Sequence, residues 1–278
     1  MRLNSQATTI DLTIGGKDYT IHQSPTLLNR PGSTTGAVIW KITPLVASWL
    51  GSPDNFLWKT GALSTSSNIL ELGCGISGLV GLVLSPLISR YVLTDQIYVA
   101  RLVEKNLEEN LVVSQQRKSS QKRKGKPPST ANPVNLRFTT LDWELDEVTS
   151  FSSLTESSQD DVTASFDAVV ACDCIYNETL IEPLVQTCAD VCRLRQRQPS
   201  CPEDANDIQN YDRAPAPALC IVAQQLRDPE IFEGWIKAFS RRFRVWRVPE
   251  EALSTELRAN TGFVVHIGVL KNDAAAGP

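Results

Sequence analysis

The stretch Asn68–Pro86, NILELGCGISGLVGLVLSP, decides the fold class. It begins as an apolar strand pattern, turns at three glycines and continues as an apolar helix pattern. Gly73, Gly75 and Gly78 fit the G-x-G-x-x-G spacing, in which a backbone turn approaches a nucleotide closely. The spacing alone does not separate a dinucleotide-binding dehydrogenase from a methyltransferase. It therefore predicts a nucleotide-binding α/β fold and leaves the nucleotide open.

Two carboxylates near this turn narrow the choice of nucleotide. Glu71 lies two residues before Gly73, where it would repel the pyrophosphate of a dinucleotide. A cationic ligand would instead be attracted by this carboxylate. S-adenosylmethionine carries a sulfonium and an ammonium group and no phosphate. Asp95 ends the next apolar run, where a carboxylate can accept hydrogen bonds from ribose hydroxyls, and both cofactor classes would use it. Glu71 thus favours S-adenosylmethionine over NAD.

Strand and helix patterns alternate through the rest of the chain, which predicts a parallel sheet with right-handed crossovers. Near the C-terminus, two apolar runs are joined by a short connection, which favours antiparallel neighbours. The predicted parallel strands are residues 68–72, 91–95, 134–143, 166–176 and 218–225, and the last two strands are 243–248 and 262–270.

Outside this core, the N-terminal residues contain two alternating runs around Gly15 and Gly16, which predict a β-hairpin extension over residues 1–35. Residues 36–50 are predicted to form a helix that carries Trp40 and leads into the core. One domain, residues 36–271, follows the extension, and residues 272–278 form a tail. Three polar inserts, 114–132, 144–161 and 196–217, are predicted to be flexible surface loops within the domain.

The charge and the cysteine content limit which binding partners and which cellular compartment the sequence suggests. The net charge of −4 gives no global reason to expect a nucleic acid, although the basic cluster 117–126 is a candidate RNA contact. No signal peptide or membrane-spanning run is present, which predicts a cytoplasmic protein, with the nucleus as a second compartment. The seven cysteines do not suggest disulfides, and their spacing with only two histidines argues against a metal site.

The motifs as a set resemble one enzyme family. ELGCGISGL, LTD with Asp95, LDW with Asp142 and Trp143, CDCIY with Asp173 and Tyr176, and GAVIW with Trp40 look like the class I, seven-stranded methyltransferases of family 16. Within that family the chain most resembles the fungal ribosomal lysine methyltransferases. The resemblance covers roughly residues 36–112 and 134–270. It implies a Rossmann-like, doubly wound seven-stranded sheet with one antiparallel strand.

The resemblance also implies a set of site residues. Asp95 would hold the ribose of S-adenosylmethionine, Asp142 would lie near the adenine amine with Trp143 against the ring, and Trp40 would close the pocket. The full set implied to bind the cofactor is Trp40, Glu71, Gly73, Gly75, Gly78, Asp95, Asp142, Trp143 and Ala171. Core packing is a strong alternative for the two tryptophans.

The Asp173-Cys174-Ile175-Tyr176 element would border the substrate lysine and supply the catalytic residues Asp173 and Tyr176. Methyl transfer needs a neutral amine held in line with the methyl group, whereas a free lysine has a pKa of about 10.4. Asp173 could hydrogen-bond the amine, and Tyr176 could offer its hydroxyl or its ring face. Structural roles at the strand end are the alternative for both.

These features predict a monomeric protein-lysine N-methyltransferase that uses S-adenosylmethionine. A large-subunit ribosomal protein is the expected substrate, and this part rests on the resemblance alone. Three alternatives remain: a lysine methyltransferase for another protein, a nicotinamide-dependent oxidoreductase, and a catalytically silent module that binds the ribosome.

Overall fold

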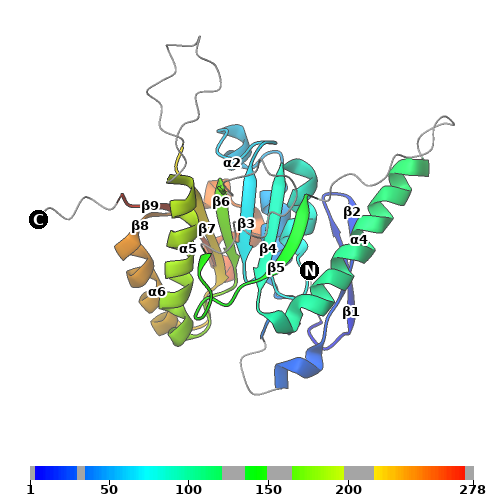
Figure 1. Cartoon of the computed structure of the whole chain (residues 1–278), viewed down its shortest axis with the longest axis horizontal. Helices are drawn as coiled ribbons and strands as arrows, with labels where there is room; N and C mark the ends of the chain where they lie inside the picture. Colours follow the sequence, from blue (N-terminus) through cyan, green and yellow to red (C-terminus); the bar gives the residue numbers. More distant parts are fainter. Residues whose placement is uncertain (1–3, 30–34, 121–134, 149–164, 197–215, 273–278) are drawn as a thin grey trace, which may run out of the picture.

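The computed structural model describes residues 4–29, 35–120, 135–148, 165–196 and 216–272. Within these residues a seven-stranded sheet has the order β5-β4-β3-β6-β7-β9-β8 (Figure 1). All neighbours pair in parallel except β9, which is antiparallel to both β7 and β8. The predicted fold class is confirmed. The strands are β3 (Asn68–Leu72), β4 (Arg90–Asp95), β5 (Leu136–Thr140), β6 (Ala168–Cys172), β7 (Leu219–Gln225), β8 (Phe243–Arg247) and β9 (Phe263–Leu270).

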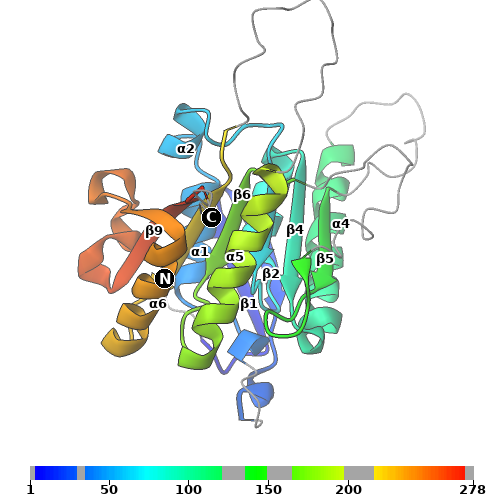
Figure 2. The same ribbon diagram turned by 60° about the vertical axis from the view of Figure 1, so that its left-hand side comes forward.

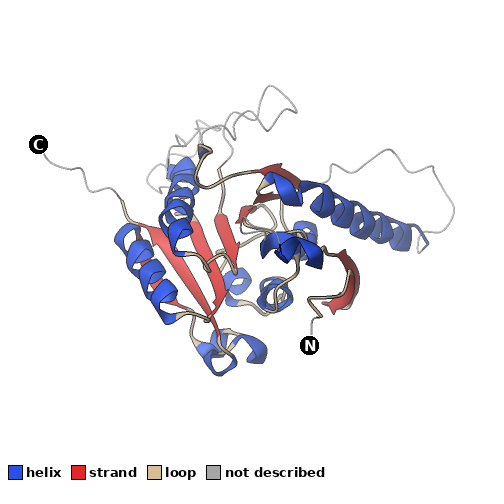
Figure 3. Ribbon diagram, turned by 90° about the horizontal axis from the view of Figure 1, so that it is seen from below, coloured by secondary structure: helices blue, strands red, loops and turns tan. Residues whose placement is uncertain are grey.

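Helices cover both faces of the sheet (Figures 2 and 3). Side chains alternate between the two faces along each strand, so that Ile69 joins the core under α1, α3 and α4, whereas Leu70 joins the core under α5 and α6. Strand β6 is buried at every position, as expected for a central parallel strand. The helices are α1 (Ile42–Leu50), α2 (Phe56–Lys59), α3 (Leu79–Leu84), α4 (Ala100–Ser120), α5 (Ile181–Gln196) and α6 (Pro229–Arg242).

The predicted N-terminal hairpin is present as a separate two-stranded sheet, β1 (Thr9–Ile14) and β2 (Lys17–His22). Gly15 and Gly16 both have positive φ angles, 58° and 74°, as the tight turn between the strands requires.

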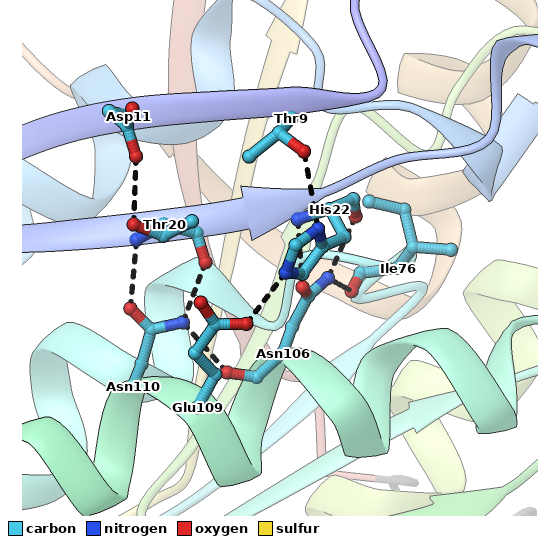
Figure 4. Close-up of polar contacts among 8 residues, drawn as sticks. All are labelled: Thr9, Asp11, Thr20, His22, Ile76, Asn106, Glu109 and Asn110. Atoms are coloured by element: carbon cyan, nitrogen blue, oxygen red, sulfur yellow. Dashed lines mark hydrogen bonds and ion pairs between the residues drawn. The ribbon is translucent and has the colours of Figure 1, made fainter.

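The hairpin is attached to helix α4 through two buried asparagines (Figure 4). The side-chain amide of Asn110 bonds both the N–H and the carbonyl of Thr20, at 3.0 and 2.9 Å, and Asn106 does the same with His22, at 2.8 and 2.9 Å. The two side-chain amides therefore pair with backbone N–H and carbonyl groups at the edge of β2, as a neighbouring strand would. Asn106 also donates to the carbonyl of Ile76 at 2.7 Å, which connects the hairpin to the glycine turn.

The structure corrects several predicted boundaries. Helix α1 begins at Ile42, not at residue 36, so Trp40 lies in the segment before the helix. Pro44 explains the late start, because proline is tolerated only in the first turn, where its missing N–H has no partner. Helix α4 continues to Ser120, so residues 114–120 are helical and not a loop. The greater part of each predicted insert lies outside the described residues.

Candidate active site

A cavity of about 290 Å³ opens at the carboxyl ends of the central parallel strands. The ends of β3, β4 and β6 meet here because these strands are neighbours in the sheet. The segment before α1 and the loops after β5 and β6 complete the wall. Almost all the predicted site residues line this one cavity: Trp40, Glu71, Gly73, Gly75, Asp95, Asp142, Trp143, Asp173 and Tyr176.

Two predicted cofactor residues, Gly78 and Ala171, are not part of the cavity wall. Gly78 starts α3 in a left-handed conformation with φ 51°, and a Cβ there would lie 3.0 Å from a methyl carbon of Leu93. Ala171 is fully buried in β6 and pairs with Leu72. Both positions are explained by packing of the sheet and α3.

The glycine turn has no room for side chains. Gly73 has φ 69°, and a Cβ there would lie 2.7 Å from the sulfur of Cys174 and 3.1 Å from the ring of Trp143. Gly75 has φ 59°, and its Cβ would lie 3.2 Å from the carbonyl oxygen of Gly36. The two glycines therefore permit both the left-handed backbone and the close approach of neighbouring loops.

Asp95 holds this turn from the end of β4. One of its oxygens accepts a hydrogen bond from the Gly75 N–H at 2.8 Å, and the other accepts from the Gln96 N–H at 2.7 Å. Burial raises the pKa of Asp95 to about 6, and the two N–H donors act in the opposite direction. The carboxyl group thus shapes the turn and also faces the cavity.

Glu71 is the most deeply buried acid of the site. Its side chain accepts a hydrogen bond from the Tyr91 hydroxyl at 2.8 Å, and no described lysine or arginine forms an ion pair with it. Burial raises the pKa of Glu71 to about 8, and the charge of Asp95 adds to the increase. The carboxyl group is therefore largely protonated near neutral pH until a cation reaches the cavity.

These features fit S-adenosylmethionine better than a dinucleotide. No lysine or arginine is among the described residues that line the cavity, so a pyrophosphate would meet two buried carboxyls and no cation. A sulfonium and an ammonium group would instead stabilise the ionised form of those carboxyls. The indole N–H of Trp143 is buried without a hydrogen-bond partner, so a polar ligand atom could satisfy it. Glu71, Asp95 and the glycine turn are the residues that would hold the cofactor.

Across the cavity, Asp173 follows β6 in a left-handed conformation, with φ 61°. It is the only residue other than glycine with a positive φ in the described part of the chain, which indicates local strain. Its carboxylate accepts two hydrogen bonds from the guanidinium of Arg227, at 2.9 and 2.6 Å, and a third from the Gln225 N–H at 3.2 Å. The guanidinium also lies 5.0 Å from the ring centre of Trp40.

The carboxylate expected to meet the substrate amine therefore already holds a cation. Sequence reasoning did not include Arg227 in the site. A signal for it exists, because Arg227 comes two residues after the end of β7 and so lies at the same edge of the sheet as Asp173. The pairing itself joins residues 54 positions apart, and no local pattern shows it.

Tyr98 is a second residue that the sequence analysis missed. It lines the cavity, and its hydroxyl oxygen accepts a hydrogen bond from the Gly36 N–H at 3.0 Å. Burial and the charge of Asp95 raise the pKa of Tyr98 well above its usual value. Tyr98 thus remains a neutral phenol that fastens the segment before α1 to the β4 side of the site.

A smaller cavity of about 60 Å³ lies beside the acceptor side of the site. Tyr176 lines both cavities, and Arg227 lines the smaller one. Gln224 also lines it, and the Gln224 side-chain oxygen is buried without a hydrogen-bond partner.

The fold and this cavity define a nucleoside-binding, doubly wound α/β protein. The family model described as lysine methyltransferase matches residues 22–123. A Zygosaccharomyces rouxii protein named ribosomal lysine N-methyltransferase 5 is 34% identical over 241 residues, which cover 79% of this chain and 70% of that protein. The chain therefore belongs to the lysine methyltransferase family, as predicted.

In two other relatives, the match to this chain covers a smaller part of the relative's own length. A Saccharomyces cerevisiae protein, also named ribosomal lysine N-methyltransferase 5, is 28% identical over 63% of this chain and 60% of its own length. A Schizosaccharomyces pombe protein named diaminohydroxyphosphoribosylamino-pyrimidine deaminase is 28% identical over 93% of this chain, but the chain spans about half of that protein, 51%. Among solved structures, the tRNA (uracil-54, C5)-methyltransferase of Pyrococcus abyssi covers 95% of this chain and 45% of its own, with 15% identity and a TM-score of 0.43, too distant to add to the argument.

No helix in the described part of the chain combines the length and the apolar character that a membrane span needs.

Proposed function

We propose that this chain transfers a methyl group from S-adenosylmethionine to the ε-amine of a lysine in a protein, and that the protein belongs to the large ribosomal subunit. The observation that carries the methyl-transfer proposal is the cavity at the strand ends, in which Glu71 and Asp95 are buried and no described lysine or arginine lines the wall. Family membership supports lysine as the acceptor. The ribosomal target is suggested by the names of the Z. rouxii and S. cerevisiae relatives.

The cofactor would supply a methyl carbon activated by the positively charged sulfur. In the transfer, the lone pair of a neutral lysine amine forms the new N–C bond, the C–S bond breaks, and its electron pair leaves with the sulfur. The lysine must lose one proton before or during this step, because an ammonium has no free pair. This chain would contribute by holding the two reactants in line and by excluding water from the cavity.

The deaminase name of the S. pombe relative is not carried over to this chain. Zinc-dependent nucleobase deaminases need an H-x-E motif and a P-C-x-x-C motif to hold and use the metal. Neither motif occurs in this sequence, whose two histidines are His22 and His266. No group of three potential metal ligands occurs among the described residues either. The chain covers only about half of that relative, so the name can refer to the other half.

Calorimetric titration with S-adenosylmethionine and with NAD separates the methyltransferase from the oxidoreductase. We expect heat of binding only with S-adenosylmethionine. Binding of NAD without binding of S-adenosylmethionine would exclude the methyltransferase proposal.

The acceptor is identified by incubating the purified chain with labelled S-adenosylmethionine and ribosomes from fungal cells that lack its gene. We expect label in one protein of the large subunit, at a lysine that mass spectrometry locates. If other proteins of the same cells are labelled at lysine and ribosomal proteins are not, the proposal of lysine methylation stands and the proposal of a ribosomal target is wrong. Cofactor binding without label in any protein would support a catalytically silent binding module.

A further inference from the structure

Three of the loops at the carboxyl edge of the sheet are rich in acidic residues. The loops that follow β3 and β4 at this edge, residues 73–78 and 96–99, contain no charged residue. We call residues 141–148, 173–180 and 226–230, which follow β5, β6 and β7, the acidic rim. Apart from the Asp173–Arg227 ion pair, the rim contains no lysine or arginine. Its acids include Asp142, Glu144, Asp146, Glu178, Asp228 and Glu230.

Some of these acids also bond to backbone within their own loops. Asp228 caps α6 by accepting from the N–H groups of Glu230 and Ile231, and Asp146 accepts from the Asp142 N–H. Such bonds explain why an acid suits those positions, but they do not neutralise its charge. Glu178 and Glu230 are exposed in the first turns of their helices. The rim therefore presents net negative charge on the β5, β6 and β7 loops at the mouth of the cavity, whereas the segment before α1 carries the exposed Lys41.

Exposed aliphatic side chains accompany this charge. Of the five large hydrophobic side chains that are exposed in the described part of the chain, three stand on loops at this same edge: Ile97, Leu145 and Leu226, with 74%, 84% and 43% exposure. Ile97 and Leu145 lie on the β4–β5 side of the cavity, and Leu226 lies on the β7 side. Exposed apolar groups that surround a site among polar residues are typical of a protein interface.

The small cavity adds an observation that points directly to a ligand. Gln224 is only 2% exposed, and its side-chain oxygen has no hydrogen-bond donor among the described residues. It lines the cavity together with Tyr176, Leu226 and Phe232, which bring an apolar or aromatic surface, and with the charged pair of neighbours Arg227 and Asp228. A buried acceptor without a donor is costly, and a donor from outside would remove that cost. The cavity thus suits a side chain with an apolar stem and an N–H group.

We propose that the acidic rim is the docking surface for a positively charged segment of the protein substrate, and that an N–H-bearing side chain of this segment reaches Gln224. This proposal rests on the proposed lysine methylation and specifies the chemistry of its substrate. The acceptor lysine would be one of several basic residues. Their charge would draw the segment to the rim, and the aliphatic side chains would pack against its apolar parts.

Direct binding tests this proposal without any methyl transfer. The probe is a short fluorescein-labelled peptide that alternates lysine and glycine, and its counterpart has glutamate in place of lysine. Fluorescence anisotropy is measured with S-adenosylhomocysteine present, at ~0.05 and ~0.3 M NaCl. We expect the lysine peptide to bind, to weaken at the higher salt concentration, and to outcompete the glutamate peptide. No binding of the lysine peptide, or equal binding of both, would overturn the proposal.

Charge reversal locates the binding surface. The rim variant is Glu178→Lys/Glu230→Lys, and the matched control is Glu104→Lys/Glu108→Lys on the exposed side of α4. Both variants change the net charge equally. We expect the rim variant to bind the lysine peptide about tenfold more weakly and the control to change by less than about twofold. Equal weakening in both variants would show a general charge effect and overturn the proposal.

Gln224→Leu tests the small cavity. Replacing an acceptor that lacks a partner by an apolar side chain should leave the melting temperature unchanged or raise it. We nevertheless expect the lysine peptide to bind several-fold more weakly, because its N–H group loses the acceptor. A variant that binds the peptide as the wild type does would exclude Gln224 from the docking surface. If the peptide binds as expected and no lysine is methylated in any protein, the proposed function fails and the docking surface remains.

Discussion

The two halves of the active-site cavity treat their carboxylates in opposite ways. On the cofactor side, Glu71 and Asp95 are buried with hydrogen-bond donors, no cationic side chain of the described residues lines the cavity, and their pKa values are raised. On the acceptor side, Asp173 is also buried, but Arg227 binds both of its oxygens. No described side chain supplies a cation to the first half, whereas Arg227 already supplies one to the second half. Ligand charge should therefore matter most on the cofactor side, and internal structure on the acceptor side.

The largest effect is expected when the acceptor-side pair is broken. Asp173→Asn keeps a residue that tolerates φ 61° but removes the negative charge beside Arg227. We expect a loss of about 2–3 kcal/mol in the free energy of unfolding, and loss of methyl transfer as Arg227 leaves its place over Trp40. Urea denaturation and transfer of labelled methyl groups measure the two effects, and cofactor binding should remain.

The matched control is Asp54→Asn in the exposed ion pair with Lys59, where the side chains are 86% and 59% exposed. Exposed pairs contribute little, so this change should cost less than about 0.5 kcal/mol. If Asp173→Asn costs no more than the control, the pair with Arg227 does not organise the acceptor side.

The second prediction concerns the glycine turn of the cofactor side. Gly73→Ala and Gly61→Ala both place a Cβ on a left-handed residue, with φ 69° and 74°. Only at Gly73 would the methyl group collide with Cys174 and Trp143, whereas nothing lies within 4 Å at Gly61. We expect Gly73→Ala to weaken S-adenosylmethionine binding about thirtyfold, or about 2 kcal/mol, and Gly61→Ala to leave it unchanged. Equal affinities in calorimetry would show that the turn does not shape the cofactor pocket.

The same comparison explains what the sequence could predict. The cofactor side is built mostly from one strand–turn–helix unit and the end of the next strand, so spacing along the chain identifies Glu71, Gly73 and Asp95. The acceptor side depends on a contact between Asp173 and Arg227, which lie on different strand ends. A strand-end rule could place both residues at this edge, but only the folded chain shows that they pair.

Boundaries were harder to predict than the order of the elements. Trp40 was expected on a helix and lies before it, because the position of Pro44 sets where α1 can begin. Gly78 was expected to bind the cofactor; it does not line the cavity, and the close approach of Leu93 leaves no room for a side chain there. In both cases a local pattern identified the segment, and tertiary packing decided what the residue does.

The third prediction separates the stability of the cofactor side from its function. The folded-state pKa of Glu71 is about 8, above the usual value of 4.5. Between these pH values the folded chain keeps a proton that the unfolded chain loses, so this group makes the wild type less stable as the pH rises. Glu71→Gln cannot ionise, so between about pH 5 and pH 7 its stability relative to the wild type should rise by about 1.4 kcal/mol for each pH unit.

The same variant should bind S-adenosylmethionine more weakly, because a neutral amide cannot become an anion beside a cationic ligand. Thermal denaturation across this pH range and calorimetry at pH 8 measure the two opposite changes. A variant that loses both stability and affinity would mean that Glu71 is mainly a structural partner of Tyr91.

The smallest expected effect is a difference between two ligands in how their binding affinity changes with pH. S-adenosylmethionine carries a positive sulfur, whereas S-adenosylhomocysteine has a neutral one. Because the cation favours the ionised form of Glu71 and Asp95, its binding should release protons below their pKa values of about 8 and 6. We expect the affinity for S-adenosylmethionine to rise about tenfold from pH 5.5 to pH 8, and that for S-adenosylhomocysteine, which keeps only the ammonium group, to rise several-fold less.

Calorimetry in two buffers with different heats of ionisation counts the released protons directly. The difference between the ligands should shrink in Glu71→Gln, where only Asp95 remains to release a proton, and persist in full in Asp173→Asn. The opposite pattern would mean that Arg227 releases Asp173 when the cofactor binds, and that the acceptor side supplies the charge that the sulfur meets. The two halves of the cavity would then be coupled through Trp40, which lines the cofactor cavity and also lies under Arg227.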